Sequence, residues 1–257
     1  MNMTDQDIEV LRYLHAVKVA TYAQIHRDIY PDKSLKTAYN RVANMSKNRL
    51  ISGSYDRLGL PVEKVLSVSK QGFQKFVASG SEHRVELKSD AVVHDLALVD
   101  IRHSMLNTGR VKEYYTENQI QTWWPIATDD KKSSMAKLRS DALAKVTFSK
   151  GDLWVAIEYE ANGKSDKRYD SLIKQYYLCL DIPLVLYVCD SQGLIDKIDE
   201  TERKIYQGEY PKLFYQLKQE IKAGETLTFT NRDRKNLRFE AKATRESIEN
   251  YPGTFPA

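Results

Sequence analysis

Residues 153–160 read LWVAIEYE, and this apolar stretch ending in two glutamates decides the fold. Its length and its β-branched and aromatic side chains predict a buried β-strand. Residues 150–152, KGD, have the composition of a tight turn, and residues 141–148 before them form a second strand candidate. The two segments therefore predict a β-hairpin.

The segments on either side of this hairpin predict the rest of the sheet. Downstream, Asn162-Gly163 breaks the chain, residues 165–180 have helical periodicity, and residues 183–189, PLVLYVC, are typical of a fully buried strand. Upstream, an amphipathic helix from residue 94 to 106 precedes a strand at 111–117. Residues 120–124 either extend this strand or form another one. The predicted order is α-β-β-β-α-β, without an internal repeat, and the fold class is α+β.

Three acidic residues of the hairpin predict a metal site. Glu158 and Glu160 are two residues apart, so on a strand their side chains point to the same face. Two carboxylates on an apolar strand repel each other and lose hydration, which a bound cation relieves. Mg²⁺ or Mn²⁺ prefers carboxylate oxygens, and the hairpin brings Asp141 close to both glutamates. The alternative is that both glutamates face solvent and the opposite face of the strand is buried.

The N-terminal third has a different pattern, with three helical segments followed by two short strands. Thr4 with Asp7 three residues later predicts a capped helix start, and Pro31 ends the second helix. The helices are expected at residues 5–15, 21–30 and 34–50, and the strands at 50–54 and 63–68. This order predicts a winged helix-turn-helix.

A basic face on the third helix and the ribbon predicts binding to double-stranded DNA. Residues 33–75 contain nine Lys or Arg and two Asp or Glu, an excess that suits a polyanion. A helix fits the major groove, so we expect Asn40 and Arg41 to contact bases. Phosphate contacts are expected from the remaining polar residues of this face, Lys33, Lys36, Thr37 and Lys47. The alternative is a winged helix that binds another protein.

Composition and the absence of certain motifs limit the class of protein and the cellular compartment. An apolar content of 42% allows a packed core. Cys179 and Cys189 have neither zinc-site nor disulfide-framework spacing, which fits a reducing compartment. The N-terminus lacks a secretory signal and no apolar run reaches the length of a membrane span. We therefore expect a cytoplasmic protein, and the absence of a Walker A loop argues against ATP-driven activity.

The chain resembles two groups of known proteins. The pattern Asp141-x16-Glu158-Tyr-Glu160 on α-β-β-β-α-β resembles the PD-(D/E)xK restriction-endonuclease-like fold. More narrowly, HDLALVDIR (94–102), LRSDALAKV (138–146) and WVAIEYEANGKSDKRYDSLIKQYY (154–177) resemble C-class mobilisation relaxases and replication-relaxation proteins of bacterial mobile elements. The resemblance spans about residues 4–190 and implies a winged helix joined to a nuclease-like domain.

The resemblance also implies roles for individual residues. Asp141, Glu158 and Glu160 would ligate the metal, and His94 would be a catalytic residue. His94 and Arg102 would line the cleft, and Arg102 and Arg139 would contact DNA, Arg139 at a phosphate. For His94 a purely structural role is the alternative. The sequence departs from the nuclease pattern at Ser140, where proline is usual, and at Glu160, where lysine is usual. A catalytic lysine would then come from the following helix, as Lys164, Lys167 or Lys174, and we favour Lys167.

These observations predict a DNA-binding domain at 1–80, a nuclease domain at 90–230 after a polar linker, and a C-terminal tail at 231–257. The first functional hypothesis is a metal-dependent, site-specific nickase acting at a plasmid transfer origin. The second is a non-catalytic replication or transcription regulator on a nuclease-like fold, and the third is a restriction-type nuclease. None of the five histidines forms the His-x-His pair of the best-known relaxases. A homodimer and a transfer-coupling ATPase are further expected partners.

Overall fold

The first of the two parts of the molecule contains short helices and a small sheet. The computed structural model describes residues 2–55, 64–78, 88–122, 130–222 and 224–241. The elements of this part are α1 (Asp5–Val17), β1 (Ala20–Thr21), α2 (Tyr22–Ile29), α3 (Leu35–Lys47), β2 (Ile51–Tyr55), β3 (Lys64–Val68), α4 (Lys70–Gly72) and the π-helical turn η1 (Phe73–Val77). The predicted helix-helix-helix-strand-strand order is present, and residues 56–63, which include most of the segment between the two predicted strands, lie outside the described residues.

Local capping explains where these helices begin. The Thr4 hydroxyl accepts the N–H of Asp7, and the Asp7 carboxylate accepts the N–H of Thr4 in return. Thr21 and Gln24 form the same reciprocal pair at α2. The strands pair in the antiparallel order β1-β3-β2, so β1 is a third strand that the sequence analysis did not predict.

The second part is built on a mixed seven-stranded sheet, which confirms the predicted combination of helices and sheet. Its order is β10-β9-β8-β7-β6-β5-β4. The strands are β4 (Val111–Thr116), β5 (Ala142–Phe148), β6 (Gly151–Glu160), β7 (Leu184–Cys189), β8 (Leu213–Leu217), β9 (Leu227–Thr230) and β10 (Asn236–Phe239). The hairpin β5–β6 is antiparallel, with Ala142 opposite Ile157, whereas β7 runs parallel to β6.

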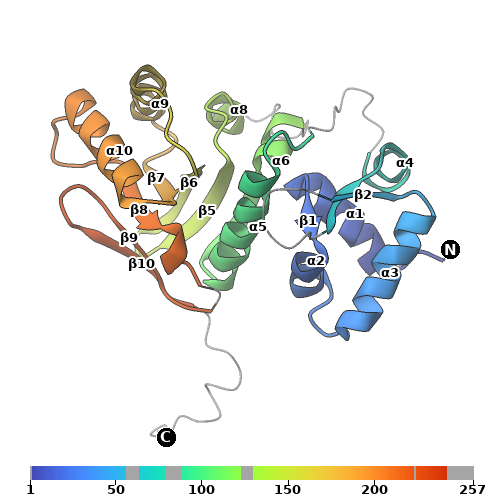
Figure 1. Cartoon of the computed structure of the whole chain (residues 1–257). Coiled ribbons are helices and arrows are strands. Elements are labelled where there is room, and N and C mark those ends of the chain that lie inside the picture. Colours follow the sequence, from blue (N-terminus) through green and yellow to red (C-terminus); the bar gives the residue numbers. More distant parts are fainter. Residues whose placement is uncertain (1, 56–63, 79–87, 123–129, 223, 242–257) are drawn as a thin grey trace, which may run out of the picture.

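Helices cover both faces of this sheet. On one face, α5 (Val92–Asn107) packs against the alternate β6 residues Val155, Ile157 and Tyr159. On the other lie α9 (Asp166–Leu178) and α10 (Gln192–Ile205), which Figure 1 shows beside the yellow and orange strands. Two further helices, α6 (Glu117–Thr122) and α8 (Asp130–Ala136), come between β4 and β5. No helix among the described residues is long and apolar enough to cross a membrane.

Two expected boundaries differ in the structure. The strand expected at 120–124 is wrong for its described residues, because α6 occupies residues 117–122. The N–H groups of Thr116 and Gln119 bond each other's side-chain oxygens, which is the capping-box arrangement that starts a helix. The predicted tail boundary at 231 is also too early, since β10 pairs with β9 and buries Phe239 in the core.

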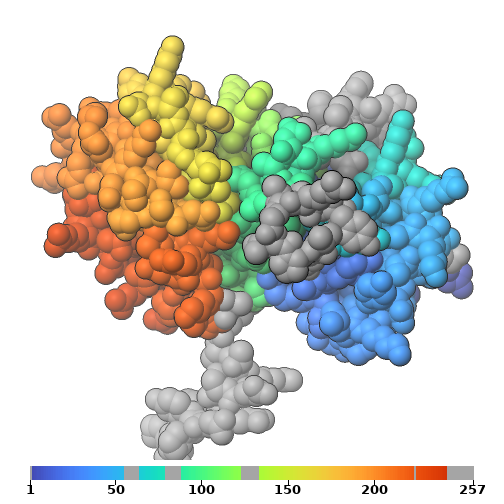
Figure 2. All heavy atoms as spheres, in the orientation of Figure 1, coloured from blue at the N-terminus to red at the C-terminus, as the bar shows by residue number. Residues whose placement is uncertain are grey.

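The two parts are joined through α5. Val99 of α5 belongs to the N-terminal core cluster, while Ala97 and Ile101 of the same helix pack on the sheet. Polar contacts add to this packing: the Gln24 side chain donates to the carbonyl of Leu96. Figure 2 shows the orange and red C-terminal segments on the side of the molecule opposite the blue N-terminal part. The predicted linker at 78–90 lies mostly outside the described residues.

Candidate active site

A cleft of about 610 Å³ opens where β5 begins and β6 ends. Side chains of both charges line it. The acidic ones are Asp90, Asp95, Glu117, Asp141 and Glu158, and the basic ones are Lys18, Lys88, His94, Arg139, Lys164 and Arg168. The cleft therefore combines carboxylates that suit a cation with cations that suit a phosphate backbone.

Asp141 and Glu158 lie together in this cleft, as the hairpin predicted. Asp141 immediately precedes β5, and its carboxylate accepts the N–H of Tyr159 at 2.8 Å. Glu158 is only 4% exposed, and its carboxylate accepts a hydrogen bond from the Tyr176 hydroxyl. Burial, and after it the negative charge of Asp141, raises the pKa of Glu158 to about 8. A buried carboxylate whose pKa is raised by a neighbouring carboxylate favours a cation between the two.

Glu160 shares the sheet face of Glu158 but has a different partner. Its carboxylate is 2% exposed and forms an ion pair with Lys164, four residues later in the loop before α9. The Tyr169 hydroxyl of α9 also donates to it, at 3.4 Å. Glu160 is not among the cleft-lining residues. The three predicted ligands therefore form a pair, Asp141 and Glu158, and a separate buried Glu160–Lys164 ion pair.

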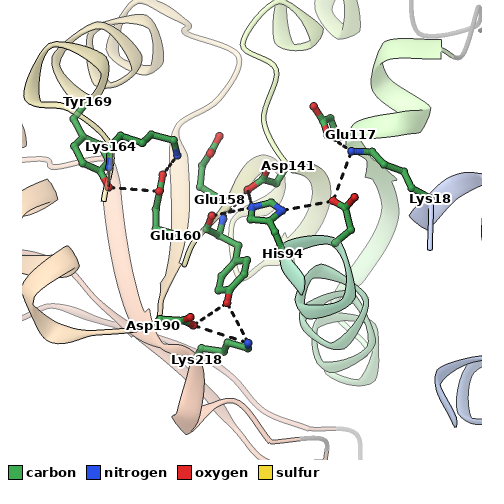
Figure 3. A network of polar contacts seen from close by, with 12 residues as sticks. Lys18, His94, Glu117, Asp141, Glu158, Glu160, Lys164, Tyr169, Asp190 and Lys218 are labelled. Carbon is green, nitrogen blue, oxygen red and sulfur yellow. Dashed lines mark hydrogen bonds and ion pairs between the residues drawn. The ribbon is translucent and has the colours of Figure 1, made fainter. Parts of the chain in front are cut away.

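His94 lies in the middle of the charged network (Figure 3). Its Nε2 is 3.5 Å from an Asp141 oxygen and 3.2 Å from the carbonyl oxygen of Tyr159, and its Nδ1 is 3.5 Å from Asp95. Burial lowers its pKa, but hydrogen bonds to Asp141 and Asp95 outweigh this effect and raise it to about 10. His94 is therefore an imidazolium cation at neutral pH and already contributes positive charge beside Asp141.

The donor set fits a hard divalent cation held by two protein ligands. Mg²⁺ is usually bound through one or two carboxylates together with water and substrate phosphate, and Asp141 and Glu158 supply such a pair. No cluster of three His, Cys, Asp or Glu side chains that could hold a metal is found within the described ranges.

Comparison with known proteins places the chain in a family. The replication-relaxation family model matches residues 11–177, well over half of the 257 residues. The chain belongs to the replication-relaxation family. No curated protein and no solved structure matches it. The matched segment runs from α1 to α9, so it includes both the N-terminal helices and the carboxylates of this replication-relaxation protein.

Among the three lysines considered as catalytic, the structure brings Lys164 to the cleft. The favoured Lys167 lies elsewhere, in a separate depression between α9 and α10. Lys174 is exposed and pairs with Asp170. Because Lys167 lies in the first turn of α9 and is exposed, its side chain points away from the carboxylates. Lys164 precedes the helix and reaches back to β6.

The residues predicted to contact DNA fall into three groups. Lys36, Asn40 and Lys47 are exposed on α3, in agreement with a binding role. Lys33 is exposed beside Asp32, and the Thr37 hydroxyl bonds that of Ser34. Arg139 is exposed and lines the cleft.

Two predicted DNA contacts are instead used within the protein. Arg41 bonds both carboxylate oxygens of Asp7, so the proposed base contact is not available in this arrangement. The guanidinium of Arg102 lies over the rings of Tyr13 and Tyr114, at 5.6 and 5.8 Å from their centroids. Arg102 thereby joins the two parts of this replication-relaxation protein.

Sequence reasoning missed several residues that line the cleft. Lys18 follows the end of α1 and Glu117 is the first residue of α6, and the two side chains meet only in the folded chain. Asp95 is next to His94 and could have been noticed as its partner. Tyr176 lies in the helical segment predicted at 165–180, but the buried hydrogen bond that it makes to Glu158 follows from the packing of α9 on β6.

Proposed function

We propose that this replication-relaxation protein is a divalent-metal-dependent, site-specific DNA endonuclease that nicks a transfer or replication origin. The observation that carries the proposal is the pairing of Asp141 and Glu158 in an open cleft whose walls also hold cations. The family supports a role in replication or mobilisation. A restriction-endonuclease-like core agrees with the order of α5, the hairpin, α9 and β7.

The side chains of the cleft suggest how a phosphodiester would be held. A divalent ion bound by Asp141 and Glu158 would supply Lewis-acid activation at the scissile phosphate. Arg139 and Arg168 line the same cleft and would bind the phosphates on either side. The ammonium of Lys164 lies beside Glu160, close enough to Glu158 and Asp141 for their charges to act on it. It is the group placed to stabilise negative charge as the phosphorus–oxygen bond breaks.

The N-terminal part would find the DNA site. Its element order agrees with a winged helix, and α3 exposes Lys36, Asn40 and Lys47 on one surface. A helix of this kind enters the major groove, where Asn40 would contact base edges and the lysines would contact phosphates. Double-stranded DNA is therefore the expected partner of this surface.

Nicking of supercoiled DNA tests the proposal. The full chain is incubated with a supercoiled plasmid carrying its own origin, in Mg²⁺ or Mn²⁺, and nicks are mapped by primer extension. Asp141→Asn should abolish nicking and leave DNA binding unchanged. Asp152→Asn is a matched control, since Asp152 lies in the same hairpin, is exposed, and pairs with Lys112. Nicking that survives Asp141→Asn would remove the proposal.

A specific observation favours the alternative, a DNA-binding regulator that does not cut. The carboxylates beside the cleft already have protein cations: His94 and Lys18 act on Asp141, and Lys164 pairs with Glu160. A regulator would bind origin DNA specifically and leave the plasmid supercoiled in both metals. Its binding would be equal in the wild type and in Asp141→Asn.

A further inference from the structure

Lys18 has a backbone conformation that residues with side chains rarely adopt. It follows α1, with φ of 66° and ψ of −49°, and the N–H of Val19 donates to the carbonyl of Val17 at 2.8 Å across it. This is a three-residue turn with positive φ at its centre, a rare and strained geometry for a residue that has a Cβ atom. Such strain persists where the rest of the structure compensates for it, and it is frequent at functional sites.

The Lys18 side chain extends from this turn into the second part of the molecule. Its ammonium donates to Glu117 of α6 at 2.5 Å and lies 3.6 Å from Asp95 of α5. The side chain is 13% exposed and lines the cleft that contains Asp141 and Glu158. The N-terminal part therefore contributes a cation to a cleft whose carboxylates come from the second part (Figure 3).

The contacts of Lys18 continue to Asp141. The same oxygen of Asp95, Oδ1, lies 3.6 Å from Nζ of Lys18 and 3.5 Å from Nδ1 of His94. His94 then reaches Asp141 through Nε2, also at 3.5 Å. Positive and negative charges alternate along these four side chains. Asp95 is 5% exposed, so a loss of its cationic neighbours is not readily compensated by water.

Contacts that do not involve Lys18 also join the two parts. The Asn118 side chain donates to the carbonyl of His15, and the Thr116 hydroxyl donates to that of Ala16. Both contacts join the end of α1 to the segment around α6, and neither uses a charge or a strained residue. The ammonium of Lys18 is therefore available for a role in the cleft.

We infer that Lys18 is a positioning residue: acting through Asp95, it fixes the orientation of His94 against Asp141. The inference rests on the proposed function for its consequence in catalysis, but the arrangement itself can be measured without cleavage. It also gives a physical link between the DNA-binding part and the cleft, because Lys18 belongs to the former and acts in the latter.

The experiment compares four variants of the full chain. Lys18→Met removes the ammonium. Lys18→Gly removes it while relieving the positive-φ strain, so this variant remains informative if the methionine variant folds poorly. Lys18→Arg retains the charge. Lys204→Met is a matched control, because Lys204 is exposed on α10 and pairs with Glu200, away from the cleft and from the basic segment 33–75.

Two measurements are made on each variant. The first is the imidazole ¹⁵N chemical shifts of His94 at one pH without metal, assigned with His94→Gln. The second is kcat and KM for plasmid nicking. Lys18→Met and Lys18→Gly should shift the His94 signals and lower kcat by about 10- to 100-fold, the usual range for residues that orient a ligand. KM should change little, and Lys18→Arg and Lys204→Met should resemble the wild type.

The two measurements test the positioning role of Lys18 and the proposed nuclease function separately. Unchanged His94 signals in both Lys18→Met and Lys18→Gly overturn the inference, whether or not the protein cuts DNA. Shifted His94 signals in a protein that cuts no plasmid support the positioning role and remove the nuclease assignment. If the His94 signals shift but kcat does not change, the inferred effect of Lys18 on catalysis is overturned. Nicking by these variants would still support the proposed function.

Discussion

The Arg41 guanidinium donates to both carboxylate oxygens of Asp7, through Nε at 2.8 Å and Nη2 at 2.5 Å. Asp7 is fully buried in α1, and the Tyr30 hydroxyl also donates to it, at 2.9 Å. Arg41 therefore fastens α3 to α1. Arg41→Ala leaves a buried carboxylate without its cation and should lower the free energy of unfolding by about 2 kcal/mol, less than for a fully buried pair because Arg41 is one-third exposed.

Urea unfolding at neutral pH measures the loss of stability in Arg41→Ala, and DNA titration measures the affinity of each variant for DNA. Asn40→Ala, on the exposed face of the same helix, should weaken DNA binding with little change in stability. An Arg41→Ala protein that is as stable as the wild type but binds DNA poorly would restore the original assignment of Arg41 as a base contact.

The same ion pair predicts loss of stability in acid. Burial raises the pKa of Asp7, but hydrogen bonds from Arg41, Thr4 and Tyr30 outweigh it and hold the pKa below 3.8. A carboxyl with a depressed folded pKa stabilises the fold above its unfolded pKa, and this contribution is lost as the pH falls through the folded value. The stability difference between wild type and Asp7→Asn, measured by urea unfolding, should therefore shrink below about pH 4. A difference that stays constant down to pH 2 would contradict the prediction.

Glu158 predicts the opposite dependence. Its pKa is raised from 4.5 to about 8, by burial first and by Asp141 second. Between pH 4.5 and 8 the folded protein therefore holds a proton that the unfolded chain has released, so the contribution of Glu158 to stability is greatest below pH 4.5 and decreases as the pH rises toward 8. Glu158→Gln should remove this decline in metal-free buffer. Thermal unfolding between pH 5 and 9 checks it, and parallel curves for the two proteins would show that Glu158 is not the titrating group.

How much of the fold the sequence predicts depends on the range of the interactions involved. The β5–β6 hairpin, α5 and α9 have strong periodicity, and the α+β class follows from them. α6 carried a signal that was overlooked, the capping box of Thr116 and Gln119. β1 is two residues long and pairs with β3, more than forty residues later in the sequence, so no local sequence pattern predicts it.

The same distinction applies to the candidate site. Asp141 and Glu158 are brought together by a local hairpin, and their proximity followed from strand geometry. Arg41 was predicted to contact DNA because helical spacing shows which face of a helix a residue lies on. Helical spacing does not show that Asp7 of another helix packs against that position and accepts a hydrogen bond from Arg41. Lys18 reaches Glu117 across 99 residues of sequence. Contacts of this kind depend on how the two parts dock, which charge patterns do not reveal.

Lys164 and Lys167 provide the final prediction, since they are three residues apart and differ in surroundings. Lys164 pairs with Glu160 and lines the cleft, whereas Lys167 is exposed in another depression. Lys164→Met should lower kcat for nicking by at least about 100-fold, since groups that stabilise transition-state charge contribute effects of this size. Lys167→Met should leave kcat within about twofold of the wild type, an expectation based on its distance from the reacting groups.

Stability must be measured in parallel, because Lys164→Met also leaves Glu160 buried without its cation. The double variant Lys164→Met/Glu160→Gln removes this uncompensated charge and should recover the melting temperature without recovering nicking. If nicking returns together with stability, Lys164 is a structural partner of Glu160 and not a catalytic group. If Lys167→Met is instead the inactive variant, the helix α9 must turn its first residues toward the cleft when DNA is bound.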